Sequence, residues 1–163
     1  MTLGLAHLVS VVLRLSKGFS EAHTGEKPMS VTATDSNVEI VKEMYESFAE
    51  GDIEAVAATW APDIEMNEPV GLVHGGTFQG ADKIMGDVFS VMGATWEDVS
   101  AVPDRFIADG DTVVAFYTWS GTSIETGKDV EYPGVHVFEL DDGAISQWTS
   151  YGDTALYNAA LDD

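Results

Sequence analysis

The sequence contains no cysteine, and this absence excludes disulfide bonds, thiolate nucleophiles and cysteine ligands for a metal. Basic side chains are scarce as well. Only 7 Lys and Arg residues stand against 28 Asp and Glu residues, which leaves a net charge of -21. A chain this acidic repels phosphate backbones and anionic lipid headgroups. The composition therefore argues against nucleic acid and membrane surfaces as partners.

The sequence also lacks the motifs of nucleotide and cofactor chemistry. It has no P-loop, no glycine pattern of a dinucleotide-binding fold and no serine nucleophile elbow. Within residues 29–163 the histidines are His74 and His136, and they do not follow a ligand spacing such as His-x-x-x-His. We therefore expect neither a metal nor another cofactor.

What the sequence does contain suits one domain. Its 163 residues are 45% hydrophobic and include seven Phe, five Tyr and four Trp, which is enough for a sizeable core. The scattered acids have two interpretations: a solvated surface selected for solubility, or adaptation to a salt-rich cytosol. We favour the second interpretation, which predicts a halophilic, cytoplasmic protein.

The first 28 residues differ from the rest in composition. They hold three of the seven basic residues and only two acids, so residues 29–163 carry 4 basic and 26 acidic side chains. The apolar run over residues 3–15 is too short to span a membrane, and it lacks both a preceding basic region and a clear cleavage site. We interpret residues 1–28 as a leader outside the domain, a mis-called extension with Met29 as the natural start. The alternative is an amphipathic helix that binds a membrane or a partner.

Three helices are predicted in the first half of the domain. The segment Ser-Asn-Val-Glu at residues 36–39 has the pattern of a capping box, and Gly51 is a candidate for the end of that helix. Asp52 caps a second helix, which runs to Trp60 and ends at Pro62. The third helix covers residues 81–92, with Ile84, Met85, Val88, Phe89 and Met92 on its apolar side.

The second half of the domain has the pattern of a sheet. Turn sequences such as Asp109-Gly110 and Thr126-Gly127 separate strands in succession, which indicates an antiparallel meander. Helices followed by a block of strands predict an α+β fold with helices on one face of a curved sheet and an apolar pocket at its mouth. The strands are expected at residues 64–67, 99–108, 112–121, 129–140 and 144–151, with a loop or irregular hairpin at residues 70–78 and a short helix at residues 154–161.

Residues 51–71 read GDIEAVAATWAPDIEMNEPVG, a short helix leading into a strand that carries a carboxylate just before a proline. This stretch resembles the opening of the ketosteroid isomerase-like (SnoaL-like, NTF2-like) families, and the resemblance extends over residues 36–161. It implies a small α+β cone, a pocket between sheet and helices, and a homodimer formed through the open face of the sheet. In the isomerases the acidic residue before that proline is the general base, so the resemblance places Glu68 in that role.

A physical argument also favours Glu68 as an acid or base. A carboxylate inside an apolar cone is desolvated, so its pKa rises toward the range of a useful acid or base. The alternative is an exposed glutamate at the end of a strand on a very acidic surface. Glu68 is one methylene longer than the aspartate that is usual in the isomerases, which changes the reach of the base.

His136 is the second candidate. By the period of two in a strand it shares a face with Tyr132, Gly134 and Phe138, so it is expected to be at least partly buried. The resemblance places it where the isomerases carry a protonated aspartate that polarises the substrate carbonyl, and a histidine can donate there in either charge state. Polyketide cyclases of the SnoaL type also resemble this arrangement. The alternative is a core histidine with a satisfied hydrogen bond.

Three further polar residues have weaker signals. Tyr45 lies near the position of the oxyanion-hole tyrosine of the isomerases, although a half-buried tyrosine packing its ring is an equal alternative. Asp153 follows the last strand, where related chains often carry a Tyr-x-Asp pattern, and the favoured alternative is an N-cap for the final helix. His74 lies in a glycine-rich loop and is expected to be exposed rather than functional.

These residues lead to two hypotheses from different classes. The first is a cofactor-free enzyme in which Glu68, His136 and Tyr45 move a proton next to the carbonyl of a small apolar substrate. The second is a ligand-binding or dimerisation module without catalysis. Epoxide hydrolysis is a weaker candidate. In the branch of these families that hydrolyses epoxides, the resemblance implies an arginine between two aspartates, and the neighbours of Arg105 do not reproduce that arrangement. The residues expected to contact the substrate are Trp60, Phe89, Trp119, Tyr132, Phe138, Trp148 and Asp153.

Overall fold

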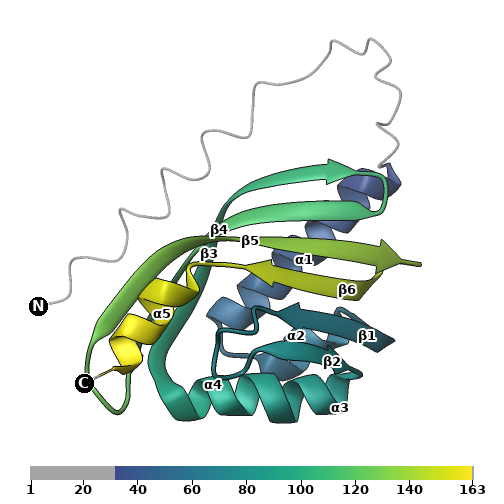
Figure 1. The fold of residues 1–163 in the computed structure, drawn as a ribbon. Coiled ribbons are helices and arrows are strands. Elements are labelled where there is room, and N and C mark those ends of the chain that lie inside the picture. Colours follow the sequence, from purple (N-terminus) through teal and green to yellow (C-terminus); the bar gives the residue numbers. More distant parts are fainter. Residues whose placement is uncertain (1–31, 163) are drawn as a thin grey trace, which may run out of the picture. The chain divides into compact units, whose positions relative to one another are not determined.

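A computed structural model describes residues 32–162, and these residues form helices packed on one face of a curved six-stranded sheet (Figure 1). The predicted α+β architecture is confirmed. The expectations about residues 1–28 and the start at Met29 lie outside the described residues. Within residues 32–162 no helix combines the length and the apolar character needed to cross a membrane.

Helix α1 (Ala33–Ala49) begins earlier than the sequence pattern predicts. Its N-cap is Thr32, whose hydroxyl accepts from the backbone N–H of Asp35, and the Asp35 carboxylate accepts from the Thr32 backbone in return. The capping box predicted at residues 36–39 is therefore wrong, because the earlier pair already satisfies the helix start. Gly51 follows the helix with a φ of +74°, which is the left-handed conformation that glycine adopts at low cost.

Helix α2 (Ile53–Ala58) is capped by Asp52 as predicted but ends before Trp60. Trp60 instead begins strand β1 (Trp60–Glu68), where it pairs with Ile145. The sequence pattern fails here because Pro62 lies inside the strand rather than at a helix end. The register between β1 and its neighbour shifts between Trp60 and Glu65, so Pro62 stands at an irregularity where its missing N–H costs no regular ladder bond.

The sheet has the strand order β2-β1-β6-β5-β4-β3. Strand β1 pairs in parallel with β6, and all the other neighbours are antiparallel, as the predicted meander requires. The remaining strands are β2 (Gly76–Gln79), β3 (Trp96–Asp109), β4 (Thr112–Ser123), β5 (Asp129–Asp141) and β6 (Ala144–Tyr151).

The third helical segment is continuous but irregular. It comprises α3 (Ala81–Ile84), a π-helical turn η2 (Met85–Phe89) and α4 (Ser90–Thr95). The extra residue in a π turn changes which side chains face the sheet, and such turns occur often at functional sites. A last helix, α5 (Thr154–Leu161), follows β6.

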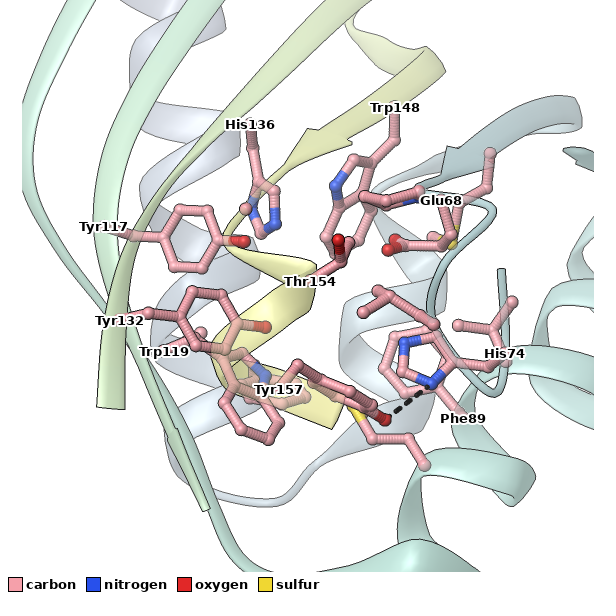
Figure 2. Close-up of a pocket in the computed structure, with 18 of the residues that line it drawn as sticks. Glu68, His74, Phe89, Tyr117, Trp119, Tyr132, His136, Trp148, Thr154 and Tyr157 are labelled. Atoms are coloured by element: carbon pink, nitrogen blue, oxygen red, sulfur yellow. Dashed lines mark hydrogen bonds between the residues drawn. The ribbon is translucent and has the colours of Figure 1, made fainter. Parts of the chain in front are cut away.

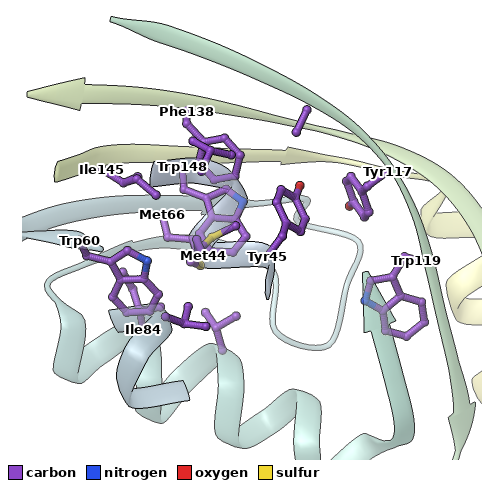
Figure 3. Close-up of a cluster of buried hydrophobic side chains, with 14 of the residues drawn as sticks. Met44, Tyr45, Trp60, Met66, Ile84, Tyr117, Trp119, Phe138, Ile145 and Trp148 are labelled. Atoms are coloured by element: carbon purple, nitrogen blue, oxygen red, sulfur yellow. The ribbon is translucent and has the colours of Figure 1, made fainter. Parts of the chain in front are cut away.

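The core lies between the helices and the concave face of the sheet (Figure 3). Buried and half-buried residues alternate along β4 and β5, so one face of these strands meets the helices. The centre of this core is formed by fully buried side chains, which include Val41, Met44, Val56, Ile64, Met66, Ile84, Val113, Phe138 and Ile145.

Candidate functional site

A cavity opens between the concave face of the sheet, helix α5 and the loop after β1 (Figure 2). Its free volume is about 60 Å³, less than half of the roughly 150 Å³ of an engineered cavity that takes up benzene. The cavity is partly open to solvent, so a ring-sized ligand would extend to its mouth or displace side chains. The lining is mostly aromatic and contains Tyr45, Phe48, Met66, Glu68, Leu72, His74, Phe89, Tyr117, Trp119, Tyr132, His136, Trp148, Thr154 and Tyr157.

Glu68 stands at the end of β1 and lines this cavity, as the resemblance predicts. Desolvation raises the pKa of its carboxyl group to about 7. The Ser150 hydroxyl on β6 donates to Glu68 Oε1 at 2.7 Å, and this hydrogen bond acts in the opposite direction by favouring the carboxylate. The balance leaves a carboxyl group that can both accept and release a proton near neutral pH.

His136 lies on β5 directly opposite Ser150, so Glu68, Ser150 and His136 form a row across three neighbouring strands. With strands about 4.8 Å apart, the backbones of Glu68 and His136 are separated by roughly 10 Å. Both side chains line the same cavity. A small ligand between the two can therefore contact both residues.

The Tyr45 hydroxyl on α1 lies 2.6 Å from Nδ1 of His136. Desolvation lowers the pKa of His136 to about 3 and holds the pKa of Tyr45 far above its ordinary value, so both groups are neutral at pH 7. Donation from the phenol to Nδ1 satisfies the Tyr45 proton, which has no other acceptor among residues 32–162. This arrangement assigns the His136 proton to Nε2, where it is available as a hydrogen-bond donor.

His74 is buried, and the expectation that it is exposed is wrong. Two successive turns, Leu72 N–H to Pro69 O and Gly75 N–H to Leu72 O, fold the loop back over the cavity. The imidazole then lies 3.3 Å from the Tyr157 hydroxyl, which itself accepts from Trp96 Nε1 at 2.5 Å. The Tyr157 oxygen accepts the hydrogen bond from Trp96, so the Tyr157 proton remains available to be donated to Nδ1 of His74. Burial lowers the pKa of His74 to about 4, so this histidine is neutral as well.

Of the seven residues expected to contact the substrate, four line the cavity and three do not. Phe89, Trp119, Tyr132 and Trp148 line it, and their contact with a substrate stays a prediction. Trp60, Phe138 and Asp153 do not, and each has a structural role instead. Trp60 packs on Phe89 and Trp148, and Phe138 packs edge-on to His136 from the core side. Asp153 is the exposed N-cap of α5, where its carboxylate accepts from two backbone N–H groups at 3.0 Å each.

Tyr117, Tyr157 and Ser150 line or support the site although the sequence analysis did not single them out. A signal for Tyr117 was present, since it shares the buried face of β4 with Trp119 by the period of two. Ser150 and Tyr157 gave no such signal, because their importance arises from contacts with residues far away in the sequence. In the part of the chain that the structure describes, no three His, Asp or Glu side chains are grouped as metal ligands would be.

The SnoaL-like domain model matches residues 41–148, so the chain belongs to this family, whose members share the NTF2-like, ketosteroid isomerase-like fold. It is similar to an NTF2-like protein from Burkholderia thailandensis E264, with 33% identity and a TM-score of 0.75 over 78% of this chain and 98% of that one. TerC, crystallised with polyporic acid, is 27% identical, with a TM-score of 0.72 over 78% of this chain and 99% of TerC.

A protein from Jannaschia sp. CCS1 that is provisionally assigned as a SnoaL-like polyketide cyclase shares the fold. Its identity to this chain is 17%, and its TM-score is 0.68 over 85% of this chain and 97% of that one. No curated protein sequence gives a match.

Proposed function

We propose that this SnoaL-like protein is a cofactor-free acid–base enzyme of the isomerase or polyketide-cyclase type. The observation that carries the proposal is the Glu68 carboxyl group, which has a pKa near 7 and lines an aromatic cavity. A general base works best when its pKa lies close to the working pH. The substrate is a small, largely apolar carbonyl compound, because the rest of the lining is dominated by aromatic rings.

In the proposed reaction the Glu68 carboxylate removes a proton from the carbon next to the carbonyl group. The C–H electron pair becomes part of a C=C bond, and the carbonyl oxygen gains the negative charge. Neutral His136 donates from Nε2 toward the substrate, while Tyr45 holds the imidazole in that tautomer and so acts as a positioning residue. Glu68 then returns the proton to the same or another carbon in the isomerase reaction. In the cyclase reaction the carbanion attacks a second carbonyl carbon, the C=O electron pair moves to its oxygen, and Glu68 gives the proton to that oxygen.

Two relatives support the choice of ligand class. The Jannaschia protein is provisionally assigned to polyketide cyclisation, and TerC was crystallised with a small organic molecule. A non-catalytic binding module of the same fold is the competing function. The small free volume favours it, since about 60 Å³ leaves little room for a substrate that must also move.

The test is hydrogen–deuterium exchange at the α-carbon of a panel of small ketones, followed by NMR in D₂O. With wild-type protein the exchange rate is expected to rise with pH through about 7, as Glu68 loses its proton. Glu68→Gln should reduce catalysed exchange by about 10² to 10⁴. Glu65→Gln is the matched control. Glu65 lies on the same strand but does not line the cavity, and its carboxylate accepts hydrogen bonds from Asn67 and Gln147. Catalysed exchange that survives in Glu68→Gln would reject Glu68 as the base, whereas wild-type exchange no faster than in the absence of protein would favour the binding module.

A further inference from the structure

His74 is a buried histidine that the proposed reaction does not use. It is 6% exposed and lines the same cavity as Glu68 and His136. The loop that carries His74 follows β1, whereas His136 lies on β5, so the two imidazole rings enter the cavity from different elements (Figure 2). A buried titratable side chain in the wall of a cavity is a candidate for contact with the ligand.

A chain of hydrogen bonds behind His74 determines which ring nitrogen carries its proton. Trp96 Nε1 can only donate, and it donates to the Tyr157 oxygen at 2.5 Å. Within residues 32–162 the Tyr157 proton has one acceptor, Nδ1 of His74 at 3.3 Å. Because burial lowers the pKa of His74 to about 4, the ring is neutral at pH 7 and its own proton lies on Nε2. Tyr157 thus orients His74 as Tyr45 orients His136.

The Nε2–H group of His74 is available to a ligand. The two nitrogens of an imidazole ring point in diverging directions, and Figure 2 shows the second nitrogen of His74 turned away from Tyr157. Within residues 32–162 the fully enclosed side-chain nitrogens without a hydrogen-bond partner belong to Trp60 and Trp148. Nε2 of His74 makes no hydrogen bond there either, so it retains accessible surface, and the cavity that His74 lines provides it.

The neutral state of His74 determines which ligand atom suits this donor. No Lys or Arg of residues 32–162 lines the cavity, and its carboxyl group is that of Glu68. A ligand carboxylate would place a second negative charge in the same apolar space without a cation to balance it. A neutral oxygen atom, such as that of a carbonyl, ether or hydroxyl group, therefore fits the Nε2–H group best.

We propose that His74 is a specificity-determining residue whose Nε2–H group binds a second neutral oxygen atom of the substrate, remote from the carbonyl group that His136 contacts. This inference rests on the proposed function and narrows its substrate class. The ligands expected to bind are small cyclic ketones with a further oxygen on the opposite side of the ring. Tyr157 and Trp96 act through His74 and are positioning residues.

The test compares cyclohexane-1,4-dione with 4-methylcyclohexanone, which is similar in size and lacks the second oxygen. Binding is followed by the quenching of tryptophan fluorescence, because Trp119 and Trp148 line the cavity. His74→Leu should weaken binding of the dione about threefold to tenfold, the loss of one hydrogen bond, and should leave binding of 4-methylcyclohexanone unchanged. His74→Gln keeps an N–H donor on a side chain of similar length, so it should retain part of the affinity for the dione.

Asn158→Ala is the matched control. The Asn158 amide donates to the Gly71 carbonyl oxygen at 2.9 Å, so it holds the same loop on α5 without contacting His74 or lining the cavity. This variant should leave the ratio of the two affinities unchanged. Equal weakening of both compounds in His74→Leu would assign His74 to packing and overturn the proposal. The same selective loss in Asn158→Ala, or no binding of either compound to the wild type, would overturn it too.

The ¹⁵N spectrum of His74 gives a second measurement, on wild-type protein. Addition of the dione should shift the Nε2 signal more than addition of 4-methylcyclohexanone does, and equal shifts would contradict a hydrogen bond to the second oxygen. The proposed function is tested separately. Loss of ketone exchange in Glu68→Gln together with unchanged dione binding in His74→Leu would reject the role of His74 and keep the enzyme. Selective dione binding through His74 without exchange by the wild type would reject the enzyme and keep the oxygen-binding site.

Discussion

At the scale of single residues, the environment of Glu68 depends on contacts between distant parts of the chain. Burial raises the pKa of its carboxyl group to about 7, and the local signals for this position are the proline after Glu68 and the resemblance to the isomerases. The hydrogen bond from Ser150 depends on the parallel pairing of β1 and β6, which joins residues 82 positions apart. The burial of His74 is not predicted from its glycine-rich loop for a similar reason, since it involves a contact with Tyr157 on the last helix. Local patterns do not contain such long-range contacts.

The raised pKa of Glu68 makes a prediction about stability. Between the ordinary pKa of 4.5 and the folded value of about 7, the native state binds more protons than the unfolded chain. Glu68 therefore lowers the free energy of unfolding as pH rises through this window, and the cost is fully present at pH 8. Glu68→Gln removes this dependence. The free energy of unfolding of Glu68→Gln minus that of wild type should therefore increase by about 2 to 3 kcal/mol between pH 5 and pH 8.

Urea denaturation at the two pH values measures this difference, because all other titrating groups are common to both proteins. Glu65→Gln provides the control. Hydrogen bonds from Asn67 and Gln147 lower the pKa of Glu65, so its titration lies below this window. A stability difference between Glu68→Gln and wild type that stays constant with pH would contradict a raised pKa.

The pair Tyr45 and His136 leads to a spectroscopic prediction. Since burial lowers the pKa of His136 to about 3, its ring should remain neutral at pH 5, with the proton on Nε2 and Nδ1 accepting from Tyr45. The ¹⁵N chemical shifts of the ring report this directly. In Tyr45→Phe the preference for Nε2–H should weaken, because the donor to Nδ1 is gone. A ring that titrates between pH 6 and 7 would contradict this assignment.

At the scale of elements, alternation predicts strands well, whereas helix ends are harder to predict. The strand at residues 144–151 has the predicted bounds, and the face shared by Tyr132, Gly134 and His136 is buried as expected. The predicted end of the second helix is wrong, because Pro62, a residue type that usually ends a helix, lies instead at a register shift within the sheet. The irregular pairing that accommodates it involves β6, which is far away in the sequence.

Helix α5 provides a test of the role of Asp153. The helix carries Tyr157, which binds His74 in the cavity, and Asp153 caps its first turn. Asp153→Ala should reduce the free energy of unfolding by about 1 kcal/mol, the usual cost of a lost N-cap. Asp153→Asn keeps a capping oxygen and should retain most of the stability in a denaturant titration. If Asn were as damaging as Ala, a role other than capping would be required.

At the scale of the whole molecule, the net charge of -21 predicts a dependence on salt. Like charges repel one another in the compact state, and salt shortens the range of this repulsion from about 10 Å at 0.1 M to about 3 Å at 1 M. The melting temperature should therefore rise between these NaCl concentrations at pH 7. The increase should be much smaller near pH 4, where many carboxylates are protonated. A melting temperature independent of salt at pH 7 would contradict the halophilic interpretation.

The homodimer that the family resemblance implies stays a prediction at this scale, as does the cytoplasmic location. Half-buried apolar residues, among them Val135, Val137 and Phe116, lie on the face of β4 and β5 that points away from the helices. A second copy of this chain is the expected occupant of that face. Light scattering of the purified protein should give the mass of two chains, and the mass of one chain would contradict the expectation.

We infer that the Glu68 carboxyl group exchanges a proton near neutral pH inside an aromatic cavity. The most direct test is an NMR titration of glutamate side-chain carboxyl carbons in ¹³C-labelled protein, with the Glu68 signal assigned by its absence in Glu68→Gln. We expect the Glu68 carboxyl group to titrate at a pKa of about 7. A Glu68 signal that titrates near the ordinary value of 4.5 would show a solvated carboxylate and contradict the acid–base mechanism.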